Sequence, residues 1–141
     1  MQRHASAAWQ GTLKEGKGTV STESGTLKET AYSFAKRFGN EAGTNPEELI
    51  AAAHAGCFSM AFSGKLTAAG FTPAHIATKA NLTFEQVEGA WTITTIHLDM
   101  AAKVPGIDQA KFEALANEAK ATCPVSRVLN AKITLAAKLE A

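Results

Sequence analysis

The longest uncharged stretch of the chain, from Leu49 to Gly64, constrains the fold more than any other feature. It lies in a segment with clear helix signals, because Asn45 suits the N-cap, Pro46 the first turn and Gly70 the stop. The sequence therefore predicts one helix of about 24 residues, which would be roughly 36 Å long. Such a helix would span most of a small domain.

Apolar residues occupy almost the whole circumference of this helix between Leu49 and Phe62. The stretch is too short, and too often broken by polar residues such as His54 and Ser59, to span a bilayer, so we predict a buried core helix. A helix that is apolar all round needs cover on every side, and one small sheet covers only one side. We therefore expect a partner subunit to supply the second layer, in an intertwined homodimer.

Strand and turn signals flank the helix on both sides. Glu88-Gly89 is read as a hairpin turn, and a slip in apolar phase between Ile93 and Ile96 indicates a bulge. The expected strands are Ala5–Thr12, Gly18–Thr22, Tyr32–Phe38, His75–Val87, Trp91–Val104 and the closing Ala131–Leu139, and the later helices are Asp108–Ala121 and a short one from Pro124. The predicted order is β-β-β-α-β-β-α-α-β, an α+β fold of mostly antiparallel strands around a long buried central helix.

Length and charge narrow the class of protein further. A chain of 141 residues is expected to form a single domain, residues 1–141. The formal net charge is +1 and no cluster of Lys and Arg stands out, so neither nucleic acid nor an anionic membrane is an expected partner. Two cysteines are too few for a secreted disulfide scaffold, and the first residues lack the apolar run of a signal peptide. We therefore expect a cytoplasmic protein whose partner is a small molecule or another protein chain.

Cys57 and Cys123 are the only cysteines, and their surroundings suggest thiol redox chemistry. Cys57 lies midway along the apolar helix, and Cys123 precedes Pro124 at an expected helix start, where free N–H groups favour a thiolate. The residues alone leave alternatives open. Cys57 could be an inert core residue, and Cys123 could be a merely structural N-cap.

His54 provides two further alternatives because it stands three positions before Cys57. The two side chains could form the Cys–His pair of a hydrolase, although nothing in the sequence marks an oxyanion hole. Together with Cys123 they could instead hold a metal ion in a non-enzymatic binding protein, yet no paired spacing supports such a site. We expect no cofactor and no metal.

Four segments carry a family resemblance. They are Gly43 to Ala61 (GTNPEELIAAAHAGCFSMA), Cys123 to Leu129 (CPVSRVL), Gly16 to Gly25 (GKGTVSTESG) and Val104 to Asp108 (VPGID). Together they resemble the osmotically inducible protein C (OsmC) family, and more closely its OsmC branch than the sister branch of organic hydroperoxide resistance proteins. The resemblance implies a thiol-dependent peroxidase that reduces organic hydroperoxides to alcohols, is itself reduced by an external dithiol that is often lipoyl, and needs no cofactor.

The resemblance also implies site residues: Cys57 as peroxidatic cysteine, Cys123 as resolving cysteine, and an Arg37–Glu47 pair that tunes the first thiol. Physical chemistry is consistent with these roles, because a thiolate in an apolar helix needs a positive charge nearby, and a guanidinium stays charged when desolvated. Helical geometry places Glu47 about 80° around the axis from Cys57 and Glu48 about 180° away. An exposed strand arginine and a first-turn acid facing the helix dipole remain the alternatives for Arg37 and Glu47.

Overall fold

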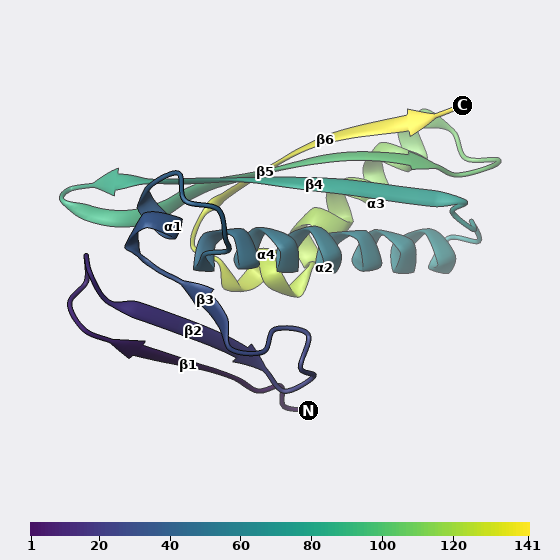
Figure 1. Cartoon of the computed structure of the whole chain (residues 1–141). Helices are drawn as coiled ribbons and strands as arrows, with labels where there is room; N and C mark the ends of the chain where they lie inside the picture. The colour runs from purple at the N-terminus through teal and green to yellow at the C-terminus, as the bar shows by residue number, and fades with distance from the viewer. The chain divides into compact units, whose positions relative to one another are not determined.

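The computed structural model describes residues 1–141, and the chain separates into two compact units, Met1–Leu49 and Ile50–Ala141. Figure 1 shows the elements of both units along the chain. The architecture is a mixed α+β fold with two sheets, each of three strands. The predicted α+β class is therefore confirmed, while the intertwined homodimer and the single domain over residues 1–141 stay predictions.

The first unit holds an antiparallel meander. Its strands are β1 (Ala5–Gln10), β2 (Lys17–Thr22) and β3 (Thr30–Tyr32), in the sheet order β1-β2-β3. In the middle of this sheet Gly18 of β2 lies directly between Trp9 of β1 and Tyr32 of β3. The predicted meander is confirmed for its first two strands.

The third predicted strand, Tyr32–Phe38, is wrong beyond its first residue. The chain leaves the sheet at Tyr32 and forms the short helix α1 (Phe34–Phe38), in which the Ser33 side chain accepts a hydrogen bond from the backbone N–H of Lys36. Phe34 and Phe38 stand four positions apart, and their ring centroids lie 4.8 Å apart, a helical contact that the alternating interpretation missed. The element order consequently gains a helix and becomes β-β-β-α-α-β-β-α-α-β.

The long helix α2 (Pro46–Ala68) begins and ends as predicted. The Asn45 side chain accepts a 2.8 Å hydrogen bond from the backbone N–H of Glu48, and Pro46 occupies the first helical position. At the other end Gly70 has a φ of +89°, and the Phe71 N–H donates to the Leu66 carbonyl. These caps fix where the cysteine-bearing part of the helix lies.

One side of α2 is buried and the opposite side is exposed. His54, Phe58, Phe62 and Leu66 are fully buried, whereas Met60 is 80 % exposed. The exposed row otherwise consists of small residues, Ala52, Gly56, Gly64 and Ala68. Within the single chain the core covers only the row of larger side chains, and the cover of the opposite side by a partner subunit stays a prediction.

By length and mean hydropathy α2 also meets the criteria for a membrane span, with a mean hydropathy of 1.2 over its best window. The helix nevertheless packs its row of fully buried aromatic and aliphatic side chains, Phe58, Phe62 and Leu66, into the hydrophobic core. This packing is typical of a core helix, as predicted from the sequence.

The second unit is built on a sheet with the order β4-β5-β6. Strands β4 (His75–Val87) and β5 (Ala90–Lys103) form the predicted antiparallel hairpin, with the left-handed residues Glu88 and Gly89 at its turn. The expected bulge is confirmed, because the register shifts between Thr83 and Phe84. The last strand, β6 (Lys132–Glu140), pairs parallel to β5.

The core of this unit lies between the sheet and its helices. Alternate residues of β5 pack against α2 and against α3 (Gln109–Thr122), whose buried face is the predicted one: Phe112, Leu115, Ala116 and Ala119. The short helix α4 (Pro124–Val128) follows directly and leads into β6. Cys123 is both the C-cap of α3 and the N-cap of α4, so the resolving cysteine of the prediction lies at a corner between two helices.

Candidate active site

The two cysteines lie in contact within the second unit. The Sγ atom of Cys123 donates to the Sγ atom of Cys57 at 2.9 Å, and both thiols are free. Cys123 is fully buried among core residues, whereas Cys57 is half-buried. The structure therefore brings together the two thiols that the sequence separates by 66 positions, and it leaves the proposed nucleophile the more accessible of the two.

The surroundings of Cys57 within its unit oppose its ionisation. Burial raises the pKa of the Cys57 thiol, and the neighbouring Cys123 raises it further, because two sulfurs in contact resist carrying negative charge together. Only the backbone N–H of Val125, in the first turn of α4, acts to lower that pKa. The sequence predicts that free N–H groups at the start of α4 favour a thiolate at Cys123. In the structure the Cys123 side chain makes no cap hydrogen bond, and the Val125 N–H bonds Cys57 instead.

A second polar contact joins the same two helices. The Nε2 atom of His54 and the Oγ atom of Ser126 lie 2.7 Å apart. His54 is fully buried, and burial holds the pKa of its imidazole below the ordinary value, so the ring is neutral near pH 7. The contact engages His54 with Ser126, so the Cys57–His54 hydrogen bond that a hydrolase pair needs is not formed.

Arg37 and Glu47 form the closest ion pair of the first unit. The Arg37 Nη2 atom lies 2.6 Å from Glu47 Oε1, and its Nε donates to both carboxylate oxygens at 3.1 and 3.2 Å. Arg37 projects from α1 and Glu47 from the first turn of α2. Glu47 is only 8 % exposed. The structure therefore brings this predicted pair together, and their catalytic roles stay predictions.

Glu48 does not compete for the arginine. Its Oε1 atom accepts a 2.9 Å hydrogen bond from the Thr44 hydroxyl, while its backbone N–H is capped by Asn45. The Glu48 side chain thus bonds the residue before the N-cap and does not complete a capping box with the Asn45 N–H. Arg37 is therefore bound by Glu47, as predicted, whereas the preference for Glu47 as the acid on the Cys57 side of the helix stays a prediction.

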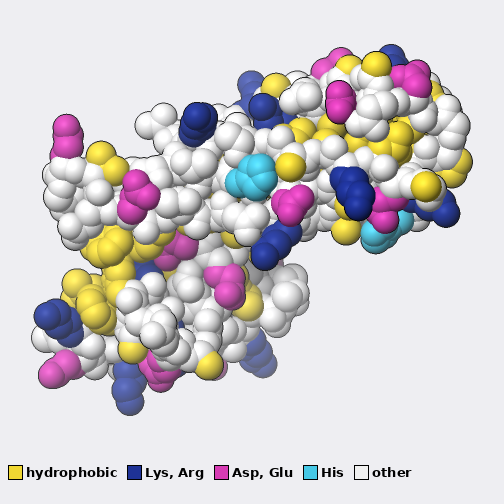
Figure 2. Space-filling view, turned by 90° about the horizontal axis from the view of Figure 1, so that it is seen from above, with side chains coloured by type: hydrophobic (Ala, Val, Ile, Leu, Met, Phe, Trp, Pro, Cys, Tyr) yellow, Lys and Arg dark blue, Asp and Glu magenta, His cyan; other side chains and the backbone are white.

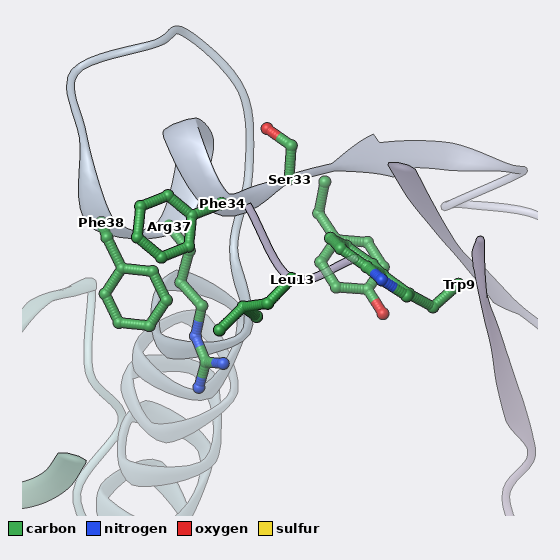
Figure 3. Close-up of a pocket in the computed structure, with 7 residues that line it drawn as sticks. Trp9, Leu13, Ser33, Phe34, Arg37 and Phe38 are labelled. Atoms are coloured by element: carbon green, nitrogen blue, oxygen red, sulfur yellow. The ribbon is translucent and has the colours of Figure 1, made fainter. Parts of the chain in front are cut away.

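An aromatic pocket lies next to Arg37 in the first unit. Its volume is about 240 Å³, and its lining residues are Trp9, Leu13, Tyr32, Ser33, Phe34, Arg37 and Phe38. Figure 3 shows Phe34 and Phe38 on one side of Arg37, with Leu13 and Trp9 on the other. The Arg37 guanidinium carbon lies 5.2 Å from the centre of the Phe38 ring, within reach of a cation–π contact. The site thus combines an apolar cavity with a fixed positive charge.

Sequence reasoning missed this pocket. The large apolar residues near Cys57 in the sequence do not line it, because Phe58 and Phe62 are fully buried core residues and Met60 is exposed. The signal that could have found the real pocket is the Trp9–Gly18–Tyr32 row across three strands, which appears only once the register is known. Ser126 was also missed, although it follows Cys123 at the spacing by which His54 precedes Cys57.

The structure gathers no set of three His, Cys, Asp or Glu side chains that could hold a metal ion. The metal-binding alternative therefore gains no support from geometry. On the face drawn in Figure 2, Lys and Arg side chains are interspersed with Asp and Glu, and no patch of one charge dominates.

A mixed α+β fold with two thiols in contact defines a dithiol protein. A family model described as "OsmC-like protein" matches residues 39–138. The chain is 53 % identical over 135 residues to the Escherichia coli protein named Peroxiredoxin OsmC, covering 96 % of this chain and 94 % of that one. The chain belongs to the OsmC-like family.

Solved structures show the same fold. An organic hydroperoxide resistance protein from Elizabethkingia anophelis superposes with a TM-score of 0.75 at 23 % identity, covering 99 % of both chains. An OsmC-like protein from Vibrio cholerae superposes with a TM-score of 0.76 at 15 % identity, covering 97 % of this chain and 99 % of that one. These similarities span both compact units of the present chain.

Proposed function

We propose that this chain reduces organic hydroperoxides to alcohols with Cys57 as the attacking thiolate and Cys123 as the resolving thiol. The chain is a cysteine-based peroxidase by its family, since its relative from Escherichia coli is named a peroxiredoxin. The observation that carries the residue assignment is the 2.9 Å contact between the two sulfur atoms. A sulfenic acid formed on Cys57 would have its resolving thiol already within reach.

The reaction proceeds in three balanced steps. The Cys57 thiolate attacks the terminal oxygen of the hydroperoxide, which carries the hydrogen, and becomes a sulfenic acid. The O–O bond breaks and releases the alkoxide, which takes up a proton to become the alcohol. The thiol of Cys123 then attacks the Cys57 sulfenic acid, forming the disulfide and releasing water. An external dithiol, for which a lipoyl group is the proposed source, reduces the disulfide to regenerate both thiols and is itself oxidised.

Arg37 is proposed to supply the charge that Cys57 lacks. Within its own unit, burial and the neighbouring Cys123 raise the pKa of the Cys57 thiol, so the thiolate requires a positive group from elsewhere. The guanidinium of Arg37 stays charged when it is desolvated, and Glu47 holds it along the edge formed by Nε and Nη2. Glu47 is then a positioning residue that fixes the arginine.

The aromatic pocket is proposed to hold the organic part of the hydroperoxide. Four aromatic rings and Leu13 give it apolar walls, and Arg37 lies among them. Apolar walls favour an alkyl or aryl hydroperoxide over hydrogen peroxide, which has no carbon to bury. This arrangement supports an organic substrate class.

We further propose that the active protein is an intertwined homodimer in the cytoplasm. The exposed row of α2, with Met60 80 % exposed between small residues, would pack against a second copy of the chain. Burial of this row would give α2 the cover on both sides that its apolar sequence requires. A reducing compartment keeps both thiols free between turnovers.

The test is a peroxide-consumption assay with purified protein, an alkyl hydroperoxide and a dithiol. The parent should consume peroxide, Cys57→Ser should not, and Cys123→Ser should form a sulfenic acid without an internal disulfide. Equal consumption by parent and Cys57→Ser would refute the assignment. Turnover of a thioester without peroxide would favour the hydrolase, and stoichiometric zinc would favour the binding protein.

A further inference from the structure

Two contacts, three residues apart on each helix, join α2 to the start of α4. Cys57 meets Cys123 at 2.9 Å, and His54 meets Ser126 at 2.7 Å. The earlier residue of one helix faces the later residue of the other, so the two segments run antiparallel at this junction. Two contacts of this kind fix both the position of α4 along α2 and its rotation about its own axis.

His54 has this one hydrogen bond and no other from its side chain. The ring is fully buried, and its Nδ1 atom has no hydrogen-bond partner. Burying an unpaired polar atom costs free energy, which an aliphatic side chain at the same place would avoid. For packing alone, a leucine would therefore suit this position better than the imidazole ring. What the ring provides and a leucine would not is the hydrogen bond to Ser126.

The two contacts differ in what oxidation does to them. When Cys57 becomes a sulfenic acid, its sulfur gains an oxygen, so the hydrogen bond that this sulfur accepts from Cys123 changes. The His54–Ser126 contact contains no atom that the reaction alters. It is the contact of the two that can hold α4 in place through the peroxide step.

We propose that the His54–Ser126 hydrogen bond is a positioning contact for disulfide formation, which keeps Cys123 facing the Cys57 sulfenic acid until the two condense. The condensation forms the S–S bond and breaks the S–O bond, and the Cys123 proton leaves with the hydroxyl group as water. This proposal rests on the proposed peroxidase function and adds Ser126 and His54 to the resolving step. Neither residue acts on the peroxide.

The test separates the two chemical steps by rapid quench. Parent protein, Ser126→Ala and Ser126→Thr are mixed with an alkyl hydroperoxide without reductant. Dimedone captures the sulfenic acid, and mass spectrometry counts sulfenic, sulfinic and disulfide forms against time. Ser59→Ala is the matched control, because it removes an α2 hydroxyl whose hydrogen bonds go to Thr78, at 2.8 Å, and to the Ala55 carbonyl rather than to α4.

Ser126→Ala should slow disulfide formation about fivefold, the ratio expected from losing one hydrogen bond of average net strength, while sulfenic acid forms at the parent rate. Dimedone adduct and sulfinic acid should accumulate accordingly. Ser126→Thr, which keeps the hydroxyl, should restore the parent ratio, and Ser59→Ala should not differ from the parent. In a Cys123→Ser background, Ser126→Ala should leave the yield of sulfenic acid unchanged.

Disulfide formation at the parent rate in Ser126→Ala would overturn the proposal, as would an equal loss in both steps, which indicates general disruption. If Ser126→Ala does not fold, His54→Leu gives the same comparison, because it also removes the hydrogen bond, with the same expected and contrary results. Failure of the parent to oxidise Cys57 would instead refute the peroxidase function itself. If Cys57 is oxidised and the disulfide forms equally fast in the parent and in the variants, only the positioning role is refuted.

Discussion

Replacing Glu47 by glutamine tests how the arginine of the site is held. Glutamine keeps the volume of the side chain and one carbonyl oxygen, but it removes the negative charge and the second acceptor oxygen. In the parent, Glu47 accepts three hydrogen bonds from Arg37, the shortest at 2.6 Å. The substitution leaves one neutral acceptor oxygen at position 47 in place of two charged ones, so it should loosen the guanidinium.

The expected cost in stability follows from burial. Hydrogen bonds to charged groups contribute about 1.5–3 kcal/mol in net terms. The Arg37 side chain is 35 % exposed, so water can replace part of what is lost, and the lower end applies. A loss of about 1.5 kcal/mol lowers the Tm of a domain of this size by roughly 5 °C. Glu48→Gln, which keeps an oxygen for the exposed contact to Thr44 and removes only the charge, should stay within about 0.5 kcal/mol.

Thermal unfolding and steady-state kinetics with an alkyl hydroperoxide measure the two consequences. Glu47→Gln should lower both the Tm and kcat/KM, the latter about tenfold, since each factor of ten corresponds to about 1.4 kcal/mol of lost transition-state stabilisation. Glu48→Gln should change neither by comparable amounts. A larger loss of kcat/KM in Glu48→Gln than in Glu47→Gln would refute the argument that Glu47 positions Arg37.

Three other outcomes are expected. Trp9→Ala should raise KM severalfold for an aryl hydroperoxide and hardly change it for hydrogen peroxide, whereas an equal change for both would contradict a role of the pocket in substrate binding. Sedimentation at micromolar concentration should give a dimer for the parent and more monomer for Met60→Glu, and a monomeric parent would refute the shared layer. His54 has its pKa lowered by burial from an ordinary value of 6.5, so the unfolded chain binds the proton first as the pH falls. Stability to urea should therefore decrease below about pH 6.5, and this decrease should be smaller in His54→Gln.

Local signals in the sequence predicted the elements that carry the thiols. Asn45, Pro46 and Gly70 are sufficient to define α2, because caps and stops act through neighbouring backbone groups. The hairpin and its bulge follow from alternation, since a shift of one residue moves every apolar side chain to the other face. The error at α1 has the same local origin, because Phe34 and Phe38 fit both an alternating and a helical pattern.

The site was predicted only in part because its contacts join residues far apart in the sequence. The family resemblance suggested the Cys57–Cys123 pair, but no spacing rule gives the distance between sulfurs that lie on different helices. Ser126 and the aromatic pocket could not be found without the register and packing that bring them together. Long-range geometry of this kind depends on the whole core rather than on any one segment.

Gly18 has no side chain, and this allows the Trp9 and Tyr32 rings that line the aromatic pocket to lie over its backbone. A Cβ atom there would come within 2.5 Å of both the Trp9 and the Tyr32 rings, whose centroids lie 5.4 Å apart over the bare backbone. The two rings thus occupy the space of the missing side chain, in the way that aromatic residues stabilise strand glycines. Adding a single methyl group at this position would tilt both rings and change the shape of the cavity without altering one polar atom. The preference for one hydroperoxide over another could therefore evolve through the backbone of β2 while the thiols and the arginine remain unchanged.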